Sequence, residues 1–460
     1  MPPRRPRAAL YRWQAEVAAQ LVRRPLLVAA QMGSGKTATF LTAAADGLAV
    51  RRFRRILLTA PRLILDTVWP AEAKVWQHTK HLRFDAAHRL SGTAREALWF
   101  DGNGDIVTCT PDTLAEFVAA AVRRRRVKID AVIIDESQAY KDSESHRARA
   151  LLGLAKVVPY VALASGTPLP NGPIDGWTPG RLVSPENPFF EVPFSRWRSR
   201  HFVRGATPYT WKPKPGTAER VADELAPAGV AMLLRDTADV PSELHLDFAF
   251  QHDSEHRAAI ATFLAHRRLE IEGEVFEAQS DGAFLARLHQ LTQGFGYLPS
   301  GRTAILSRAR VEALADVIGG VAGPVLVASR YRADIALIRE RFPDAVVVDG
   351  ATPVRARAEV IDRFNGDRIP LLVANAATLG HGVNLQKGSC QTVIWFAGSW
   401  SYETFAQFNA RVVRAGQGKR VSIVTLKSDT GLDAAIAAVI AAKAGGEAAL
   451  LQALNQGRQS

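Results

Sequence analysis

The chain has 460 residues, of which 47% are hydrophobic and 22% charged, and its net charge is +13 at pH 7. This length suits two or three domains, and this composition argues against wholesale disorder. The two cysteines, Cys109 and Cys390, lie far apart in the sequence, which excludes a cysteine metal cluster and argues against a disulfide framework.

Short apolar runs alternate with helix-like stretches through the first half of the chain. The runs are apolar at every position, as strands are when helices cover both faces of a sheet. This rhythm predicts a parallel α/β sheet. Its strands are expected at residues 26–30, 55–60, 105–109, 129–135 and 160–164.

The middle of the chain has a different character. Residues 168–215 are rich in Pro, Gly, Trp and Phe and predict an irregular insertion held by aromatic packing, while 254–319 are mostly helical in pattern. From residue 323 the α/β rhythm resumes, which predicts a second sheet, and an Ala-rich helix is expected at 432–454. The second set of strands is expected at residues 324–329, 345–348, 371–374, 392–396 and 421–425.

The strongest local signal is VAAQMGSGKT at residues 28–37, which follows a predicted strand and opens a predicted helix. The amides of a glycine-rich turn can surround phosphate oxygens, and a helix N-terminus adds positive potential there. Lys36 would reach the β- and γ-phosphates of ATP, and Thr37 would hold Mg²⁺. Although Ala30 stands where the general pattern has Gly, this context favours a phosphate site over a chance turn.

A second predicted strand ends in two carboxylates, Asp135 and Glu136. We expect Asp135 to bind Mg²⁺, and Glu136 to orient or deprotonate the attacking water. Because strands often end in acidic residues, this pair is specific only in combination with the glycine-rich loop.

These motifs, with others in the same order over nearly the whole chain, resemble those of superfamily 2 helicases. SGTPLPN at residues 165–171 and QFNARVVRAGQ at residues 407–417 are similar to signatures of the Swi/Snf-like group, and LLRD at 233–236 resembles a third. The resemblance implies two tandem RecA-like parallel-sheet lobes with a helical, irregular insertion between them. The expected bounds are 1–240 for the first lobe, with the insertion at about 168–230, then 241–320 for a helical linking region and 321–460 for the second lobe.

The resemblance also assigns roles to single residues. Arg411 and Arg414, expected on one face of a helix, would stabilise charge on the transferred phosphoryl group and complete a catalytic set with Lys36 and Glu136. Gln138 stands where the family has His, and it cannot titrate. The other expected ATP contacts are Gln14, Gly33, Ser34, Gly35, Gly382 and Gln407. The residues expected to couple hydrolysis to movement are Gln138, Ser165 and Thr167. The expected DNA contacts are Arg62, Thr110, Ser329, Arg330 and Thr378.

Two features outside the motifs have competing interpretations. The basic excess of the chain fits either a nucleic-acid partner or a solvated Arg-rich surface. The basic run at residues 123–128 also has two interpretations: it either contributes to a DNA-binding surface or forms a solvated loop. Trp177, Trp197 and Trp211 are expected to pack a small core in preference to stacking on bases.

The resemblance implies an ATP-dependent translocase that runs on double-stranded DNA through phosphate contacts. Two alternatives remain, namely a strand-separating DNA or RNA helicase with the same ATPase, and an ATP-switched DNA-binding protein without motor activity. The N-terminus has no apolar segment typical of a secretory signal, and no stretch is expected to span a bilayer. We therefore expect a bare bacterial or phage motor in the cytoplasm, with no membrane contact and with a possible separate protein partner.

Overall fold

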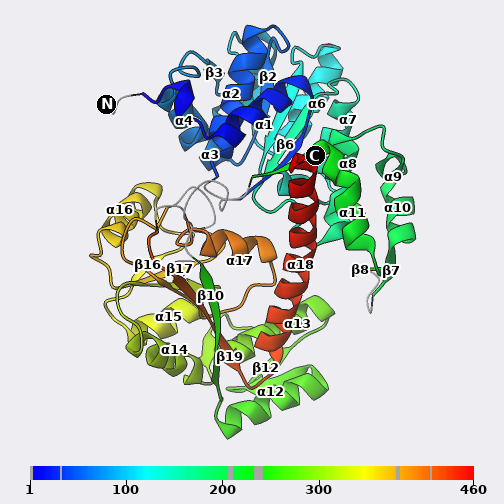
Figure 1. Cartoon of the computed structure of the whole chain (residues 1–460). Helices are drawn as coiled ribbons and strands as arrows, with labels where there is room; N and C mark the ends of the chain where they lie inside the picture. The colour runs from blue at the N-terminus through cyan, green and yellow to red at the C-terminus, as the bar shows by residue number, and fades with distance from the viewer. Residues whose placement is uncertain are drawn as a thin grey trace. The chain divides into compact units, whose positions relative to one another are not determined.

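The structure, a computed structural model, describes residues 4–31, 34–205, 211–232, 242–379, 384–414 and 417–459 (Figure 1). The chain forms two compact units. Unit 1 contains Met1–Thr237 together with Ala442–Ser460, and unit 2 contains Ala238–Ala441. The tandem arrangement of two parallel-sheet lobes that the sequence predicts is confirmed.

The centre of unit 1 is a seven-stranded parallel sheet in the order β3-β4-β2-β5-β6-β1-β9. All five strands predicted for this half are present, and β3 and β9 extend the sheet at its two edges. The strands are β1 (Leu27–Ala30), β2 (Ile56–Thr59), β3 (Phe84–Asp85), β4 (Ile106–Cys109), β5 (Ala131–Asp135), β6 (Val161–Ser165) and β9 (Gly229–Met232).

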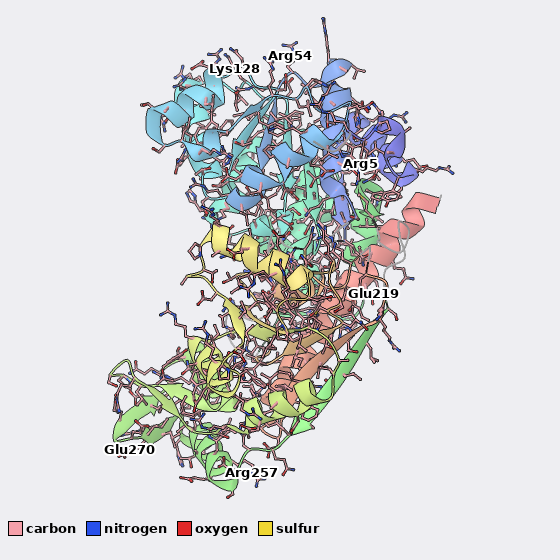
Figure 2. All side chains as sticks on the ribbon, turned by 90° about the vertical axis from the view of Figure 1, so that its left-hand side faces the viewer. Arg5, Arg54, Lys128, Glu219, Arg257 and Glu270 are labelled. Carbon is pink, nitrogen blue, oxygen red and sulfur yellow. The ribbon has the colours of Figure 1, made fainter. Side chains whose placement is uncertain are left out.

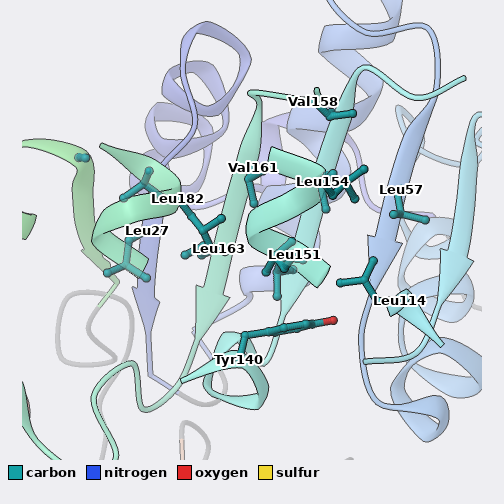
Figure 3. Packing of buried hydrophobic residues seen from close by; sticks show 14 of the residues in the cluster. Leu27, Leu57, Leu114, Tyr140, Leu151, Leu154, Val158, Val161, Leu163 and Leu182 are labelled. Atoms are coloured by element: carbon teal, nitrogen blue, oxygen red, sulfur yellow. The ribbon is translucent and has the colours of Figure 1, made fainter. Parts of the chain in front are cut away.

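Both faces of this sheet are buried, which explains why its strands are apolar at every position. Successive side chains alternate between the faces, so Leu57 packs in one core and Leu58 in the other. Figure 3 shows part of the first core, where Leu27 and Leu163 from the sheet pack with Leu151 and other residues of the covering helices. The helices that precede the insertion are α1 (Arg12–Arg23), α2 (Lys36–Ala49), α3 (Arg62–Thr67), α4 (Trp69–Val75), α5 (Gly92–Asp101), α6 (Leu114–Arg124) and α7 (His146–Ala155).

The insertion expected to be irregular consists mainly of short helices and one hairpin. Trp177 and Trp197 are buried in the core of unit 1, as expected, because the aromatic side chains of the insertion pack against one another. The elements are α8 (Trp177–Val183), α9 (Pro188–Glu191), α10 (Phe194–His201), the β7 (Phe202–Arg204) and β8 (Trp211–Pro213) hairpin, and α11 (Thr217–Leu225).

Unit 2 contains a six-stranded parallel sheet in the order β10-β19-β18-β15-β17-β16. Its strands are β10 (Glu243–Phe250), β15 (Val325–Ser329), β16 (Val346–Val348), β17 (Leu371–Asn375), β18 (Thr392–Trp395) and β19 (Val421–Ser428). Its helices are α12 (Ser254–His266), α13 (Asp281–Gln293), α14 (Ala309–Gly319), α15 (Arg332–Arg341), α16 (Val354–Asn365) and α17 (Tyr402–Asn409). Two small hairpins, β11 (Arg268–Ile271) with β12 (Glu274–Glu277) and β13 (Phe295–Tyr297) with β14 (Thr303–Ile305), interrupt the helical pattern.

The units divide the chain differently from the expected bounds. Residues 241–320 are not a separate linking region, because β10 pairs along its whole length with β19 and α14 packs on the second sheet. The edge strand β10 was not predicted, because most of its side chains are exposed or half-buried and it has no apolar run. The expected end of the first lobe, at residue 240, lies outside the described residues.

The C-terminal helix α18 (Leu432–Gln459) belongs to both units. Its first residues pack in a core of unit 2, with Leu432 and Ile436, and its last turns pack in the core of unit 1, with Leu450 and Leu454. Contrary to expectation, residues 432–454 are long and apolar enough to cross a membrane, with a hydropathy of 1.6. This is weak evidence for a membrane span, because a core helix has the same composition and the buried residues of α18 pack in protein cores.

Candidate nucleotide-binding site

The predicted phosphate-site residues of unit 1 gather at one edge of its sheet. Strands β1, β5 and β6 are parallel, so their C-terminal ends lie at the same edge. The glycine-rich loop follows β1, the Asp135–Glu136 pair lies at the end of β5, and Ser165 ends β6. This is the edge at which open α/β sheets bind ligands.

Lys36 is the first residue of α2, and its ammonium group lies between two carboxylates. Its Nζ atom is 3.0 Å from Oδ1 of Asp135 and 2.6 Å from Oε1 of Glu136. Burial disfavours the charged ammonium, but the two carboxylates outweigh this effect and raise the pKa of Lys36 above its ordinary value. The lysine is therefore charged and held at the N-terminus of a 14-residue helix.

The residues of the loop fit a bound nucleotide. The hydroxyl group of Ser34 is buried and has no hydrogen-bond partner among the described residues, so it is available to a ligand. Gly35 adopts a left-handed conformation with φ of 80°, which turns the chain into α2. Thr37 follows in the first turn of α2, where its hydroxyl and the carboxylate of Asp135 are the oxygen ligands that Mg²⁺ prefers. Gly33 lies outside the described residues.

Gln14 contacts this loop directly. Its side chain accepts a hydrogen bond from the backbone N–H of Tyr11 at 2.9 Å and donates one to the carbonyl of Gly35 at 3.3 Å. A Cβ atom on Gly35 would lie 2.3 Å from Nε2 of Gln14. Glycine is therefore needed at position 35 for two reasons, the backbone conformation and the close approach of Gln14.

Trp69 holds the second oxygen of Asp135. Its indole Nε1 donates to Oδ2 at 2.9 Å, and the ring is 1% exposed. The sequence contains no signal for this contact, because the two residues are 66 positions apart. The bond holds the Asp135 oxygen that Lys36 does not contact.

Glu136 is held in an uncommon backbone conformation, with φ of 59° and ψ of 59°. A non-glycine residue in this left-handed region costs on the order of 1–3 kcal/mol and persists only when its surroundings enforce it. Here the backbone N–H of Glu136 donates to Oδ1 of Asp135 at 3.1 Å, and Oε1 of Glu136 lies on Lys36. The strain therefore occurs at the carboxylate that is expected to activate water.

The three predicted coupling residues form a chain of hydrogen bonds that starts at Glu136. Gln138 donates from Nε2 to Oε2 of Glu136 at 2.8 Å, and its Oε1 accepts from the hydroxyl of Ser165 at 2.6 Å. That hydroxyl accepts in turn from the backbone N–H of Thr167 at 3.0 Å. The amide of Gln138 has both a donor and an acceptor, so it joins β5 to the segment after β6 without titrating.

Arg411 and Arg414 of unit 2 lie in turns that follow α17, not on a helix as expected. The helix ends at Asn409, after which the backbone N–H of Arg411 donates to the carbonyl of Phe408, three residues back, at 3.1 Å. Arg411 is 4% exposed, while Arg414 donates to the side chain of Asn384. Burial lowers the pKa of Arg414 from its ordinary value, and a guanidinium keeps its charge at neutral pH.

The other two predicted nucleotide contacts of unit 2 are Gln407 and Gly382, of which the structure describes only Gln407. Gln407 is buried on α17, and its Nε2 donates to Oε1 of Glu403 at 3.2 Å. Gly382 lies outside the described residues.

The predicted DNA contacts of unit 1, Arg62 and Thr110, follow the neighbouring parallel strands β2 and β4. The side chain of Arg62 is 68% exposed at the start of α3, and Thr110 exchanges hydrogen bonds with Thr113. Both residues therefore lie at the C-terminal edge of the sheet.

Unit 2 presents a similar pair. Arg330 follows β15 and Thr378 follows β17, and the side chain of Asn375 donates to the carbonyl of Arg330 at 2.9 Å. Ser329 is 1% exposed and its hydroxyl donates to the carbonyl of Ala374. Arg330 is thus the member of the Ser329–Arg330 pair that can reach a ligand in this structure.

Two family models match the chain. Residues 11–171 match the DEAD/DEAH box helicase model, and residues 309–416 match the helicase conserved C-terminal domain. The first match lies in unit 1 and the second in unit 2. Together they include all the residues predicted to bind or hydrolyse ATP.

Known proteins that are similar to this chain differ in how much of it they match. Putative protein p41 of Acyrthosiphon pisum secondary endosymbiont phage 1 is 26% identical over 420 residues, which cover 88% of this chain and 89% of the relative. The SWI/SNF-related matrix-associated actin-dependent regulator of chromatin subfamily A-like protein 1 homolog of Caenorhabditis elegans is 30% identical over 164 residues, or 34% of this chain. Helicase swr1 of Schizosaccharomyces pombe is 35% identical over 83 residues, or 18% of this chain.

The chain spans only 21% of the length of the Caenorhabditis elegans relative and 6% of the length of helicase swr1. Among solved structures, the chain is similar to the Sulfolobus solfataricus SWI2/SNF2 ATPase core in complex with dsDNA. The TM-score of this match is 0.43 with 18% sequence identity, and it covers 99% of this chain and 98% of the other.

Proposed function

The chain belongs to the nucleic-acid-dependent ATPases of the superfamily 2 helicase type, in their Swi/Snf-like group, and on that premise we propose that it couples ATP hydrolysis to translocation along double-stranded DNA. The observation that carries the proposal is the connection of the catalytic carboxylate to the segment that follows β6. Glu136 bonds Gln138, Gln138 bonds Ser165, and Ser165 bonds the backbone of Thr167. A change at the γ-phosphate can thus alter a segment outside the nucleotide site.

ATP would bind at the N-terminus of α2. Its phosphates would take the place of the carboxylates around the Lys36 ammonium, while Ser34 and the amides of the loop would donate to phosphate oxygens. A bound Mg²⁺, held by Thr37 and Asp135, would supply charge neutralisation on the phosphate oxygens.

Glu136 would then act on water. Held through Lys36 and Gln138, it is positioned to orient a water molecule and accept its proton while the water oxygen bonds to the γ-phosphorus. The bond between that phosphorus and the oxygen that leaves with ADP breaks in the same displacement.

Arg411 and Arg414 would complete the site from unit 2. Guanidinium groups on the phosphoryl oxygens contribute about 10³–10⁵ in rate in comparable ATPases and GTPases. Hydrolysis would therefore be fast only when the two units bring these arginines to the nucleotide. Loss of the γ-phosphate would release them, so that each cycle would contain one closing and one opening step.

Movement along DNA would follow from a contact on each unit. Arg62 and Thr110 lie at the sheet edge of unit 1, and Arg330 and Thr378 lie at the sheet edge of unit 2. If both pairs bind phosphates of one strand, the opening and closing of the units would advance one pair relative to the other. Phosphate contacts carry no base information, as a translocase requires.

The relatives support this choice among the alternatives. The Caenorhabditis elegans protein is named as a SWI/SNF-related regulator of chromatin, which favours duplex translocation over strand separation. The phage protein, which matches most of the chain, supports a motor of phage or bacterial type.

The proposal is tested by ATP hydrolysis and strand displacement with defined nucleic acids. We expect duplex DNA to stimulate hydrolysis more than single-stranded DNA or RNA, and we expect the protein to displace the third strand of a triplex without separating the duplex. Separation of a duplex would instead indicate a helicase, and an ATPase rate that no nucleic acid alters would indicate a switch. Lys36→Ala and Glu136→Gln should each abolish stimulated hydrolysis, and if either retains it, the site is wrongly assigned.

A further inference from the structure

One segment of the insertion is strongly basic and contains no acidic residue. Between Glu191 and Glu219 the sequence has six cationic side chains, and the family motifs do not include them. They are Arg196, Arg198, Arg200, Arg204, Lys212 and Lys214. The segment forms α10 and the β7–β8 hairpin at one edge of unit 1, beside α11 (Figure 1).

Most of these cations are exposed, and they have no acidic partner among the described residues. Arg196, Arg200, Arg204 and Lys212 are exposed, and none of them makes an ion pair in the part of the chain that the structure describes. Lys214 is also exposed, and its ammonium donates to the carbonyl of Arg200 at 2.7 Å at the end of α10. The acidic side chains of the described residues therefore leave the positive charge of this surface largely unpaired.

The run at residues 123–128 has the opposite character. Arg123 lies 2.5 Å from a carboxylate oxygen of Glu96, and Asp101 lies within 3.8 Å of the cationic groups of Arg124, Arg126 and Lys128. These ion pairs favour the solvated-loop interpretation of that run. Figure 2 places Lys128 of this run far from Glu219, which lies on α11 next to the basic segment of the insertion, so the two basic segments are separate surfaces.

A rigid base supports the exposed cations of the insertion. Trp197 of α10 is fully buried, and Phe202 at the start of β7 packs against its ring. The guanidinium groups of Arg198 and Arg204 lie 4.5 Å and 5.8 Å from the ring centroid of Trp211 in β8. In the hairpin Val203 pairs with Lys212 and Arg204 pairs with Trp211, so cations occur on both faces.

We propose that α10 and the hairpin, residues 194–204 and 211–214, form a basic arm. The arm would bind the phosphates of duplex DNA at a place other than the DNA contacts predicted from the motifs. The inference rests on the proposed function and adds a second DNA-binding surface to it. Guanidinium groups suit phosphates because they donate two parallel hydrogen bonds, and three of the four unpaired cations are arginines. The arm would keep the protein bound to DNA while the two units open.

The test is the salt dependence of duplex DNA binding by the full chain, followed by fluorescence anisotropy between about 50 and 200 mM salt, where counterion release dominates affinity. The arm variant combines Arg196→Ala, Arg200→Ala, Arg204→Ala and Lys212→Ala. The matched control combines Arg123→Ala, Arg124→Ala, Arg126→Ala and Lys128→Ala, which removes the same charge from the ion-paired run.

Each lost phosphate contact makes the slope of log K against log salt shallower by about 0.9. Loss of all four contacts should therefore make this slope shallower by about 3.6. We expect the slope to become shallower by about this amount in the arm variant and by less in the control variant. A variant with Arg196→Lys, Arg200→Lys and Arg204→Lys, which keeps Lys212, retains the charge and should show the wild-type slope, which separates charge from any effect on folding.

Equal slopes in the wild type, the arm variant and the control would overturn the arm while leaving the proposed function intact. Failure of the wild-type protein to bind duplex DNA would instead overturn the proposed function. If the arm variant binds DNA normally but loses binding to a polyglutamate peptide, the surface is a protein-binding site and the proposal is wrong.

Discussion

Replacing Gln138 by Leu should disconnect the Glu136 carboxylate, which we propose to be catalytic, from the segment after β6. The side chain is 4% exposed, and its amide bonds both Glu136 and Ser165. Leucine has a similar volume but neither donor nor acceptor. The loss of one hydrogen bond to a charged group is worth about 1.5–3 kcal/mol. At about 1.36 kcal/mol for each factor of ten, kcat for DNA-stimulated hydrolysis should fall about 10- to 150-fold.

The assay is steady-state ATP hydrolysis at saturating duplex DNA, with kcat and KM for ATP determined separately. KM should change little, because the residues expected to bind phosphate, Lys36 and Ser34, are untouched. Gln77→Leu is the matched control, because Gln77 is exposed in the same unit. Gln138→His, which keeps a donor and an acceptor, should retain most of the activity. A folded Gln138→Leu protein with the wild-type kcat would refute the role of this connection.

Three further predictions concern buried polar groups. Trp69→Phe removes the indole donor of Asp135, so denaturant unfolding should show a loss of about 1.5–3 kcal/mol, and an unchanged midpoint would contradict the bond. Arg310→Met leaves the buried Asp433 without its ion-pair partner, which lies at 2.5 Å, and should destabilise the protein by about 3–5 kcal/mol. The double variant with Asp433→Leu should recover part of this loss in the same measurement. Burial, with the nearby cationic groups, lowers the pKa of His252 to about 4, so the unfolded state binds more protons between pH 6.5 and about 4. Stability should therefore fall as the pH is lowered through this range, and it should fall less in His252→Asn; equal pH profiles would show that His252 is not responsible.

Much of the candidate nucleotide site was predictable because its signals are local. A glycine-rich turn between a buried strand and a helix places Lys36 by itself, and an apolar strand that ends in two carboxylates places Asp135 and Glu136. The strands were predictable for a related reason, since a strand covered on both faces is apolar throughout. The exposed edge strand β10 has no such run, and it was not predicted.

Arg411 and Arg414 show the limit of local reasoning. Their spacing suits one face of a helix, but the helix ends at Asn409. There the side chain of Asn409 accepts a hydrogen bond from the indole of Trp395, and the carbonyl of Arg411 accepts from the backbone N–H of Leu385. Contacts with distant segments thus decide the local conformation of the turn.

The sequence alone determined which residues form the candidate phosphate site and that two parallel sheets build the chain, because those properties depend on neighbours within a few positions. Tertiary structure decided which charges are neutralised and which remain available. Asp101 and Glu96 reach the run at 123–128 only after α5 and α6 pack together, whereas no acidic side chain in the described chain pairs with Arg196, Arg200, Arg204 or Lys212. An unpaired charge can only be recognised in three dimensions, because Coulomb attraction depends on distance in space and not along the chain.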